Sequence, residues 1–262
     1  MSGHHDCVYW VTGAGSGIGK ATAELLAEKG ASVLATDVAA GSLTWAKDIE
    51  GIETATCDVT DPAANQSAVA AAVERFGKLS GAALNAGVTG SIPIDDAEGL
   101  PLLKANLDVN VVGVVHGIRA ALPALRANGG GAFTVTASTS GIGGDPGMWA
   151  YNAAKGAAIN LVRSVSVELG HEQIRINAVA PGPTESGMTE GILGSGPNPV
   201  SESIRQRVPL KRWGLAREQA AAHAFLLSTE ASFITGAVLP VDGGITANTG
   251  QFLPPSGTET LS

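Results

Sequence analysis

The chain has 262 residues, a length typical of one α/β domain, and its 44% apolar and 15% charged residues predict a large core and exclude a disordered chain. A net charge of −8 disfavours nucleic acid and anionic membrane surfaces as partners, and no apolar run reaches the roughly 18 residues of a membrane span. The N-terminal segment 1–7 lacks the apolar core of a signal peptide, so we expect a cytoplasmic protein. Neither His4 nor His5 has a partner at metal-ligand spacing, so we expect no metal site.

A short apolar strand at residues 7–12 leads directly into a glycine-rich turn, which is followed by an amphipathic helix at about residues 18–29. This order is the context that a phosphate-binding loop needs, because glycines let the backbone approach a pyrophosphate and the helix N-terminus attracts negative charge. Glycine clusters alone are often only turns, but the flanking strand and helix favour a dinucleotide site. The residues expected to bind the dinucleotide here are Gly13, Ser16, Gly17, Ile18 and Gly19.

The second predicted strand covers residues 31–36 and ends at Asp37. A carboxylate at this point can accept hydrogen bonds from the adenosine ribose hydroxyls and would repel a 2′-phosphate. The neighbouring Ser16 and Val38 carry no compensating positive charge. The sequence therefore favours NAD over NADP. The alternative is that Asp37 only caps a helix at residues 41–49.

Asp58 and Val59 follow a third predicted strand at residues 53–57. At the end of a strand next to the dinucleotide site, their expected partner is the adenine ring. The alternative for Asp58 is a structural role in the turn before Asp61.

The next predicted elements alternate between helix and strand, which indicates right-handed crossovers and a parallel sheet. An alanine-rich helix at residues 62–76 leads to a fourth strand at 81–84, and residues 85–87 end that strand at the edge of the glycine turn. Asn110 lies on an apolar segment, residues 107–125, that predicts a buried helix. A buried amide needs a hydrogen-bond partner, and a purely structural amide is the alternative to a functional one.

Ser138 and the pair Tyr151 and Lys155 form the centre of the predicted site. Ser138 closes a β-branched apolar run, at the edge of an open α/β sheet where ligands bind. A tyrosine and a lysine four residues apart lie on one face of a helix, and a nearby ammonium favours the phenolate and lowers the tyrosine pKa. Such a pair alone is commonly just a helix face with a solvated lysine, so its meaning depends on a nucleotide site elsewhere.

Together these residues resemble the short-chain dehydrogenase/reductase family over almost the whole chain. Each motif is modest alone, and their order and spacing make the resemblance specific. Two positions differ from the family pattern. Leu84 stands where many members have a second asparagine, and Ser186 stands where a threonine often binds the nicotinamide amide. The matching residues are Thr12, Gly13, Gly17, Ile18, Gly19, Asp58, Val59, Asn85, Ala86, Gly87, Asn110, Ser138, Tyr151, Lys155, Pro181, Gly182, Ile234–Gly236 and Val241–Gly244.

The resemblance implies a single Rossmann-like domain, a doubly wound sheet of seven parallel strands with helices on both faces. It implies that Tyr151 is the general base for a secondary alcohol, that Lys155 lowers the tyrosine pKa and holds the nicotinamide ribose, that Ser138 binds the substrate oxygen, and that Asn110 holds a water that relays the proton. A tyrosine with an ordinary pKa near 10 needs about 4 kcal/mol of phenolate stabilisation to act near pH 7. The further residues expected at the cofactor are Asn85, Ala86, Gly87, Pro181, Gly182, Thr184 and Ser186.

The expected substrate is a neutral, apolar secondary alcohol of alicyclic or terpenoid type, oxidised to a ketone. The three segments expected to border the nicotinamide, residues 87–103, 139–150 and 182–204, contain no lysine or arginine, and an anionic substrate would usually need one. Some of their apolar side chains could instead belong to the core. The candidate substrate-lining residues are Ile92, Ile94, Ile142, Met148, Met188, Ile192 and Leu193.

Residues 1–245 are predicted to form the dinucleotide-binding domain with its substrate site, and residues 246–262 a polar tail that is disordered or reaches a neighbouring subunit. The resemblance implies a mobile lid at about residues 184–205. It also implies a homotetramer with two-fold contacts through the Tyr151 helix and through the C-terminal helix and strand. Two alternatives remain open. One is an NADPH-dependent ketoreductase of the acyl-carrier-protein type, disfavoured by Asp37 and the negative charge. The other is a non-catalytic nucleotide sensor, disfavoured by the complete set Asn110, Ser138, Tyr151 and Lys155.

Overall fold

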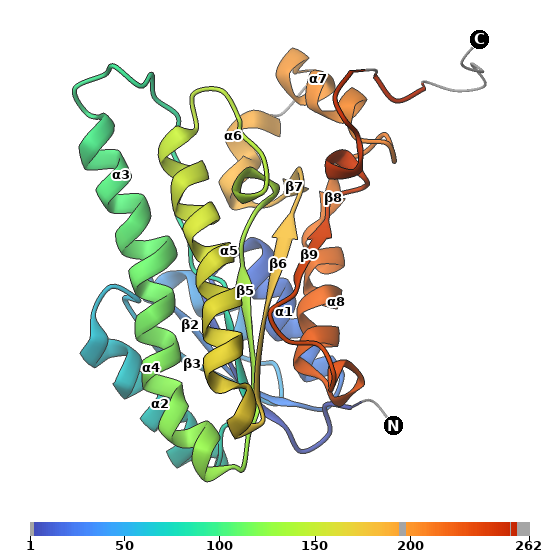
Figure 1. Ribbon diagram of the computed structural model, residues 1–262. Coiled ribbons are helices and arrows are strands. Elements are labelled where there is room, and N and C mark those ends of the chain that lie inside the picture. The colour runs from blue at the N-terminus through green and yellow to red at the C-terminus, as the bar shows by residue number, and fades with distance from the viewer. Residues whose placement is uncertain (1–2, 194–197, 252, 256–262) are drawn as a thin grey trace.

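The computed structural model describes residues 3–193, 198–251 and 253–255, and Figure 1 shows a central sheet between two layers of helices. Seven parallel strands pair in the order β3-β2-β1-β4-β5-β6-β9, which confirms the predicted doubly wound, Rossmann-like sheet. The order reverses direction between β1 and β4, which is where such folds bind ligands. The strands are Val8–Thr12 (β1), Ser32–Asp37 (β2), Ile52–Thr56 (β3), Gly81–Leu84 (β4), Gly131–Thr136 (β5), Ile174–Pro181 (β6) and Val238–Val241 (β9).

Helices cover both faces of this sheet. The described helices are α1 (Gly17–Glu28), α2 (Pro62–Phe76), α3 (Gly99–Leu107), α4 (Gly113–Ala127), α5 (Trp149–Leu169), α6 (Glu190–Leu193), α7 (Pro199–Arg207) and α8 (Ala216–Leu227). Helices α2, α4 and α5 lie on one face, and α1 and α8 lie on the other (Figure 1). A separate two-stranded pair, Thr184–Glu185 (β7) and Gly214–Leu215 (β8), lies above the carboxyl ends of the strands. No helix in the described part of the chain is both long and apolar enough to cross a membrane.

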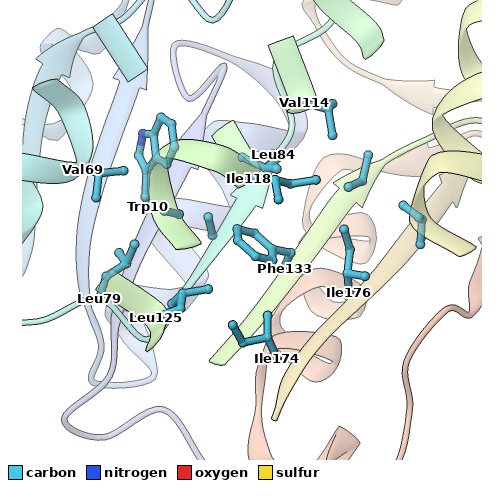
Figure 2. Close-up of a cluster of buried hydrophobic side chains, with 14 of the residues drawn as sticks. Trp10, Val69, Leu79, Leu84, Val114, Ile118, Leu125, Phe133, Ile174 and Ile176 are labelled. Carbon is cyan, nitrogen blue, oxygen red and sulfur yellow. The ribbon is translucent and has the colours of Figure 1, made fainter. Parts of the chain in front are cut away.

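The core is divided by the sheet because successive strand residues point to opposite faces. In β1, Trp10 is fully buried in the cluster under α2 and α4, which also contains Phe133 of β5 (Figure 2). The neighbouring Tyr9 and Val11 are buried in the cluster under α1 and α8. This two-sided burial explains why β1 is apolar from Val8 to Val11 rather than alternating.

The segment around Asn110 differs from the single helix predicted at residues 107–125. The chain is helical from Gly99 to Ala127, and its middle, Asp108–Val112, is a π-helical turn that contains Asn110 (Figure 1, where α3 and α4 form one rod). A π-turn holds one extra residue in the turn, and such turns are frequent at functional sites. The apolar pattern predicted burial correctly, but it could not indicate this change in helical geometry.

Candidate functional site

A cavity of about 750 Å³ opens at the carboxyl ends of β1, β4, β5 and β6, at the switch point of the sheet. Most of the residues predicted to bind the cofactor or to carry the chemistry line it, although they come from segments far apart in the chain. A second cavity, of about 780 Å³ at the opposite edge of the sheet, contains none of them. The predicted residues that line the first cavity are Gly13, Ser16, Gly17, Ile18, Asp37, Asn85, Ala86, Gly87, Ser138, Tyr151, Lys155, Pro181, Gly182, Thr184 and Ser186.

The glycine turn after β1 fits a dinucleotide pyrophosphate. Gly13 and Gly17 have φ angles of 64° and 52°, a backbone conformation that favours glycine. A Cβ on Gly17 would lie 3.0 Å from Cβ of Ser186 across the cavity, so glycine keeps this passage open. Ser16 precedes α1 without a side-chain cap, which leaves the first N–H groups of the helix free to bind an anion.

Asp37 is held in place by two backbone N–H groups. Its Oδ2 accepts a hydrogen bond from the N–H of Gly15 at 3.0 Å, and its Oδ1 accepts one from the N–H of Ala39 at 3.1 Å. The predicted alternative, a cap for a helix at 41–49, is not seen, because a 3₁₀ helix at Ala40–Ala46 follows with Ala39 as its N-cap. The carboxylate therefore lies in the cavity wall beside the glycine turn, as binding of a ribose diol requires.

Tyr151 and Lys155 lie one turn apart near the start of α5, and both are buried. The Lys155 ammonium lies 5.6 Å from the centre of the Tyr151 ring and donates a hydrogen bond of 2.8 Å to the carbonyl oxygen of Thr136 at the end of β5. The Tyr151 side chain is hydrogen-bonded to Ser138, which follows β5. One strand end and one helix therefore bring the phenol, the ammonium and the serine hydroxyl together.

The direction of the tyrosine pKa differs from the expectation that Lys155 lowers it. Burial raises the pKa of Tyr151, and the hydrogen bond with Ser138 counteracts this only in part. Burial also lowers the pKa of Lys155 to about 8. Spacing alone predicted the approach of the two side chains, but it could not show how strongly both are removed from solvent. The consequence is a phenol that keeps its proton near pH 7.

Asn110 lies behind this group and does not line the cavity. Its Nδ2 donates to the carbonyl oxygen of Val88 at 2.9 Å, and its Oδ1 accepts from the N–H of Val88 at 3.2 Å. A Cβ on Gly87 would lie 2.7 Å from Oδ1 of Asn110 and 3.3 Å from Nζ of Lys155. The partner expected for the buried amide is thus the segment after β4, and Gly87 allows Asn110 and Lys155 to approach it.

Several other predicted residues lie outside the cavity. Asp58 Oδ1 accepts hydrogen bonds from the backbone N–H and the hydroxyl of Thr60, which is the turn role weighed as its alternative. Gly19 lies beneath the glycine turn, where a Cβ would come within 2.2 Å of the carbonyl oxygen of Gly13. Of the substrate-lining candidates, Met148, Met188 and Ile192 line the cavity, whereas the following predicted residues do not: Val59, Ile92, Ile94, Ile142 and Leu193.

Asp145 and Arg207 are charged residues of the cavity wall that the sequence did not identify as site residues. Asp145 lies in the loop before α5, and its Oδ2 accepts a hydrogen bond of 2.5 Å from the hydroxyl of Ser140. Arg207 is the last residue of α7, three positions beyond the last segment expected to border the nicotinamide. The helical spacing of Val200, Ile204 and Arg207 places these three residues on one helix face, and this spacing could have identified Arg207.

His223 was also not identified from the sequence, and it supports the site without lining the cavity. It is fully buried on α8, where Nδ1 lies 2.9 Å from the hydroxyl of Thr134 and Nε2 lies 3.1 Å from that of Thr136. The Thr136 hydroxyl also donates to Oδ1 of Asn85 at 2.9 Å, and Nδ2 of Asn85 donates to the carbonyl oxygen of Gly13. The imidazole is therefore connected through side chains to the glycine turn.

Burial lowers the pKa of His223 from its ordinary 6.5 to about 3. Below pH 6.5 this histidine binds a proton in the unfolded chain but stays neutral in the folded chain. The free energy of unfolding therefore decreases as the pH falls from 6.5 towards 3. We expect His223→Gln, which keeps hydrogen-bonding groups but does not titrate, to lose about 2 kcal/mol less free energy of unfolding than wild type between pH 7 and 4.5. Urea unfolding at both pH values measures this difference, and equal losses would contradict it.

The comparisons with known proteins agree with this arrangement. A family model described as enoyl-(acyl carrier protein) reductase matches residues 13–246. Levodione reductase of Leifsonia aquatica is 37% identical over 92% of this chain and 95% of its own length. Meso-2,3-butanediol dehydrogenase of Serratia marcescens is also 37% identical, over 92% of this chain and 95% of its own. A 3-oxoacyl-(acyl-carrier-protein) reductase of Thermotoga maritima is 34% identical, over 90% of this chain and 96% of its own.

Solved structures show the same fold. The crystal structure of levodione reductase has a TM-score of 0.86 and covers 93% of this chain and 98% of its own, at 37% identity. A 7α-hydroxysteroid dehydrogenase, solved with NADH and 7-oxo glycochenodeoxycholic acid, has a TM-score of 0.84 at 29% identity and covers 92% of this chain and 94% of its own. The similarity therefore extends over nearly the full length of both chains.

Proposed function

The chain belongs to the short-chain dehydrogenase/reductase family, and from this membership we propose that it is an NAD-dependent oxidoreductase that interconverts a neutral, apolar secondary alcohol and its ketone. Its relatives act on alcohols and ketones according to their names, and the fold is one that binds a nicotinamide cofactor. The observation that carries the proposal is the convergence of Tyr151, Ser138 and Lys155 with the glycine turn on one cavity. The bound dinucleotide would supply the hydride acceptor or donor.

In this proposal the side chains of the chain position the substrate and move its proton. The Ser138 hydroxyl binds the substrate oxygen, and Tyr151 takes the hydroxyl proton during oxidation or returns it during reduction. Lys155, fixed by the Thr136 carbonyl, stabilises the phenolate electrostatically and holds the nicotinamide ribose. Asn110 anchors the segment after β4 and would hold a water that carries the proton outward.

The choice of NAD rests on the fixed position of Asp37. Because its two oxygens are held by backbone N–H groups, the carboxylate cannot easily turn away from a 2′-phosphate, which it would repel. Ser42 and Ser16, two polar side chains near the glycine turn, are neutral. An NADP preference would need a basic residue at one of these places.

The raised pKa of Tyr151 predicts different pH profiles for the two directions. Oxidation needs the phenolate, whose fraction increases tenfold per pH unit below the pKa, whereas reduction needs the phenol, which is already present at pH 7. We expect kcat/KM for oxidation to rise by up to tenfold per pH unit from pH 6 and to flatten above about 8, where Lys155 loses its charge. Initial rates in both directions test this, and an oxidation rate independent of pH between 6 and 8 would contradict it.

The substrate class rests on the apolar part of the cavity wall. Met148, Met188 and Ile192 contribute apolar surface there, and α7 adds Val200 and Ile204 from the lid region predicted at 184–205. Part of that region, residues 194–197, lies outside the described residues, as do position 252 and residues 256–262 of the predicted tail. Arg207, the last residue of α7, adds one positive charge to the wall. An apolar carbon skeleton with one reacting hydroxyl fits this wall.

The decisive experiment measures reduction of NAD and of NADP with a panel of cyclic, aromatic, terpenoid, steroidal and diol secondary alcohols. We expect NAD reduction with cyclic alcohols to exceed both NADP reduction and activity on charged hydroxy acids. A clear preference for NADPH with acyl thioester ketones would instead favour a ketoreductase of the acyl-carrier-protein type, which one relative is named for. Binding of NAD without turnover of any alcohol would favour a nucleotide sensor.

We also propose that the protein is a cytoplasmic homotetramer that assembles through α5. Ala153 and Ala157 are exposed on that helix, and Gly156 lies between them, which gives a small-residue face suited to close helix packing. Sedimentation equilibrium tests the assembly, and a monomer at micromolar concentration would contradict it.

A further inference from the structure

Asp145 is connected to the reacting centre by a short chain of hydrogen bonds. The Ser140 hydroxyl donates to Oδ2 of Asp145 at 2.5 Å, and the backbone N–H of Ser140 donates to Oγ of Ser138 at 3.1 Å. Ser140 itself is buried, so this link is fixed rather than a chance surface contact. Ser140 thus links the Asp145 carboxylate to the Ser138 hydroxyl, which would bind the substrate oxygen.

The second carboxylate oxygen is available to a ligand. Asp145 lines the cavity and is an exposed residue, and no donor among the described residues is bonded to its Oδ1. An ionised carboxylate only accepts hydrogen bonds, so it requires a donor on the ligand. The charge of Asp145 also acts at the reacting centre. Burial is the largest cause of the raised pKa of Tyr151, and the negative charge of Asp145 raises that pKa further.

This negative charge selects among substrates. An anionic group near the reacting carbon would be repelled by the carboxylate. A purely apolar group would displace water from the carboxylate without replacing its hydrogen bonds, which costs free energy. A hydroxyl group satisfies the free oxygen with a charge-assisted hydrogen bond, which is stronger than one between neutral groups. Met148 and Met188 also line the cavity and offer apolar surface to the carbon skeleton of the substrate.

We propose that Asp145 forms a subsite for a second hydroxyl group of the substrate, close to the hydroxyl that reacts. The preferred substrates are then diols, and hydroxyketones in the reverse direction, rather than simple secondary alcohols. This inference rests on the proposed alcohol oxidation at Tyr151 and narrows its substrate class. It assigns Asp145 a role in specificity, which neither the motifs nor the spacing of the sequence indicates.

The test compares cyclohexanol with cis- and trans-cyclohexane-1,2-diol, using NAD and wild type, Asp145→Ala, Asp145→Asn and the control Asp95→Ala. Asp95 is an exposed carboxylate that does not line the cavity. Hydrogen bonds to charged groups contribute roughly 1.5–3 kcal/mol, so wild type should prefer one diol over cyclohexanol by at least tenfold in kcat/KM. Asp145→Ala should reduce this ratio about tenfold or more, Asp145→Asn should reduce it less, and Asp95→Ala should leave it unchanged.

A wild-type ratio near one, or a ratio that Asp145→Ala leaves unchanged because both substrates lose activity equally, would overturn the subsite. Either result would leave the proposed alcohol oxidation intact, because cyclohexanol or another simple alcohol would still be oxidised. If no secondary alcohol of any kind is oxidised while NAD still binds, the proposed function itself fails and the subsite with it. The two failures are therefore distinguished in the same experiment.

Discussion

Replacement of Tyr151 by phenylalanine is expected to reduce kcat by at least a thousandfold while NAD binding changes less than threefold. The substitution removes only the phenol oxygen, which is the atom proposed to accept the proton and which is bonded to Ser138. General acid–base groups contribute roughly 10²–10⁴ to rates, and phenylalanine has no group that can accept or return the proton. Steady-state rates with a cyclic alcohol and titration of NAD binding separate the two effects.

The other tyrosine of the chain provides the matched control. Tyr9 is buried in β1, and its hydroxyl lies 3.0 Å from Nδ1 of His4, far from the cavity. Tyr9→Phe removes the same atom and should cost about 1 kcal/mol of stability with little change in turnover. Near-normal turnover in Tyr151→Phe, or a comparable loss in both variants, would remove Tyr151 from its proposed role.

Replacement of Gly19 by alanine should weaken NAD binding by a hundredfold or more and lower the melting temperature by several degrees. A Cβ at this position would lie 2.2 Å from the carbonyl oxygen of Gly13 and 2.5 Å from Nδ2 of Asn85. Neither atom can move freely, because Asn85 is also bonded to Thr136, and overpacking of this kind costs about 1–3 kcal/mol. The glycine turn must open, and its N–H groups then no longer converge on the pyrophosphate.

Gly41→Ala is the control for this change. Gly41 lies in the 3₁₀ helix after β2, where a Cβ would meet no atom within 4 Å. The same added methyl group should therefore leave both NAD affinity and melting temperature near wild type. Isothermal titration and thermal unfolding of both variants provide the comparison, and an equal response of the two would show that Gly19 has no special packing role.

Regular periodicity explains why the sheet could be predicted from the sequence. The glycine turn after β1 and the alternation of strands with helices specified a parallel sheet, and the predicted bounds of α2 and β4 agree with the structure. Strand β6 was not predicted separately, and only Pro181 at its end was recognised through a motif. Helix α3 was also missed, because Gly99 and Pro101 at its start gave no clear helical pattern.

The site likewise contains residues that the sequence could predict and residues that it could not. Motif residues such as Ser138 and Tyr151 are close to one another in the chain, so spacing could indicate their meeting. Asp145 and His223 could not be found this way, because their roles depend on contacts made only after folding: a loop carboxylate against Ser140, and an imidazole between two threonines of β5. The pKa of Tyr151 likewise depends on burial, which no local pattern records.

The wide turn at Asp108–Val112 makes the length of this segment as important as its composition. Helices α3 and α4 form one rod in which an extra residue shifts the rotational phase beside the candidate site. Since each residue advances a helix by about 100°, deletion of Val111 would restore ordinary winding and rotate one half of the rod against the other. Asn110 could then no longer face Val88 while α3 kept its packing against α5 and α4 its packing against the sheet. In this part of the chain, insertions and deletions should therefore be more damaging than most substitutions.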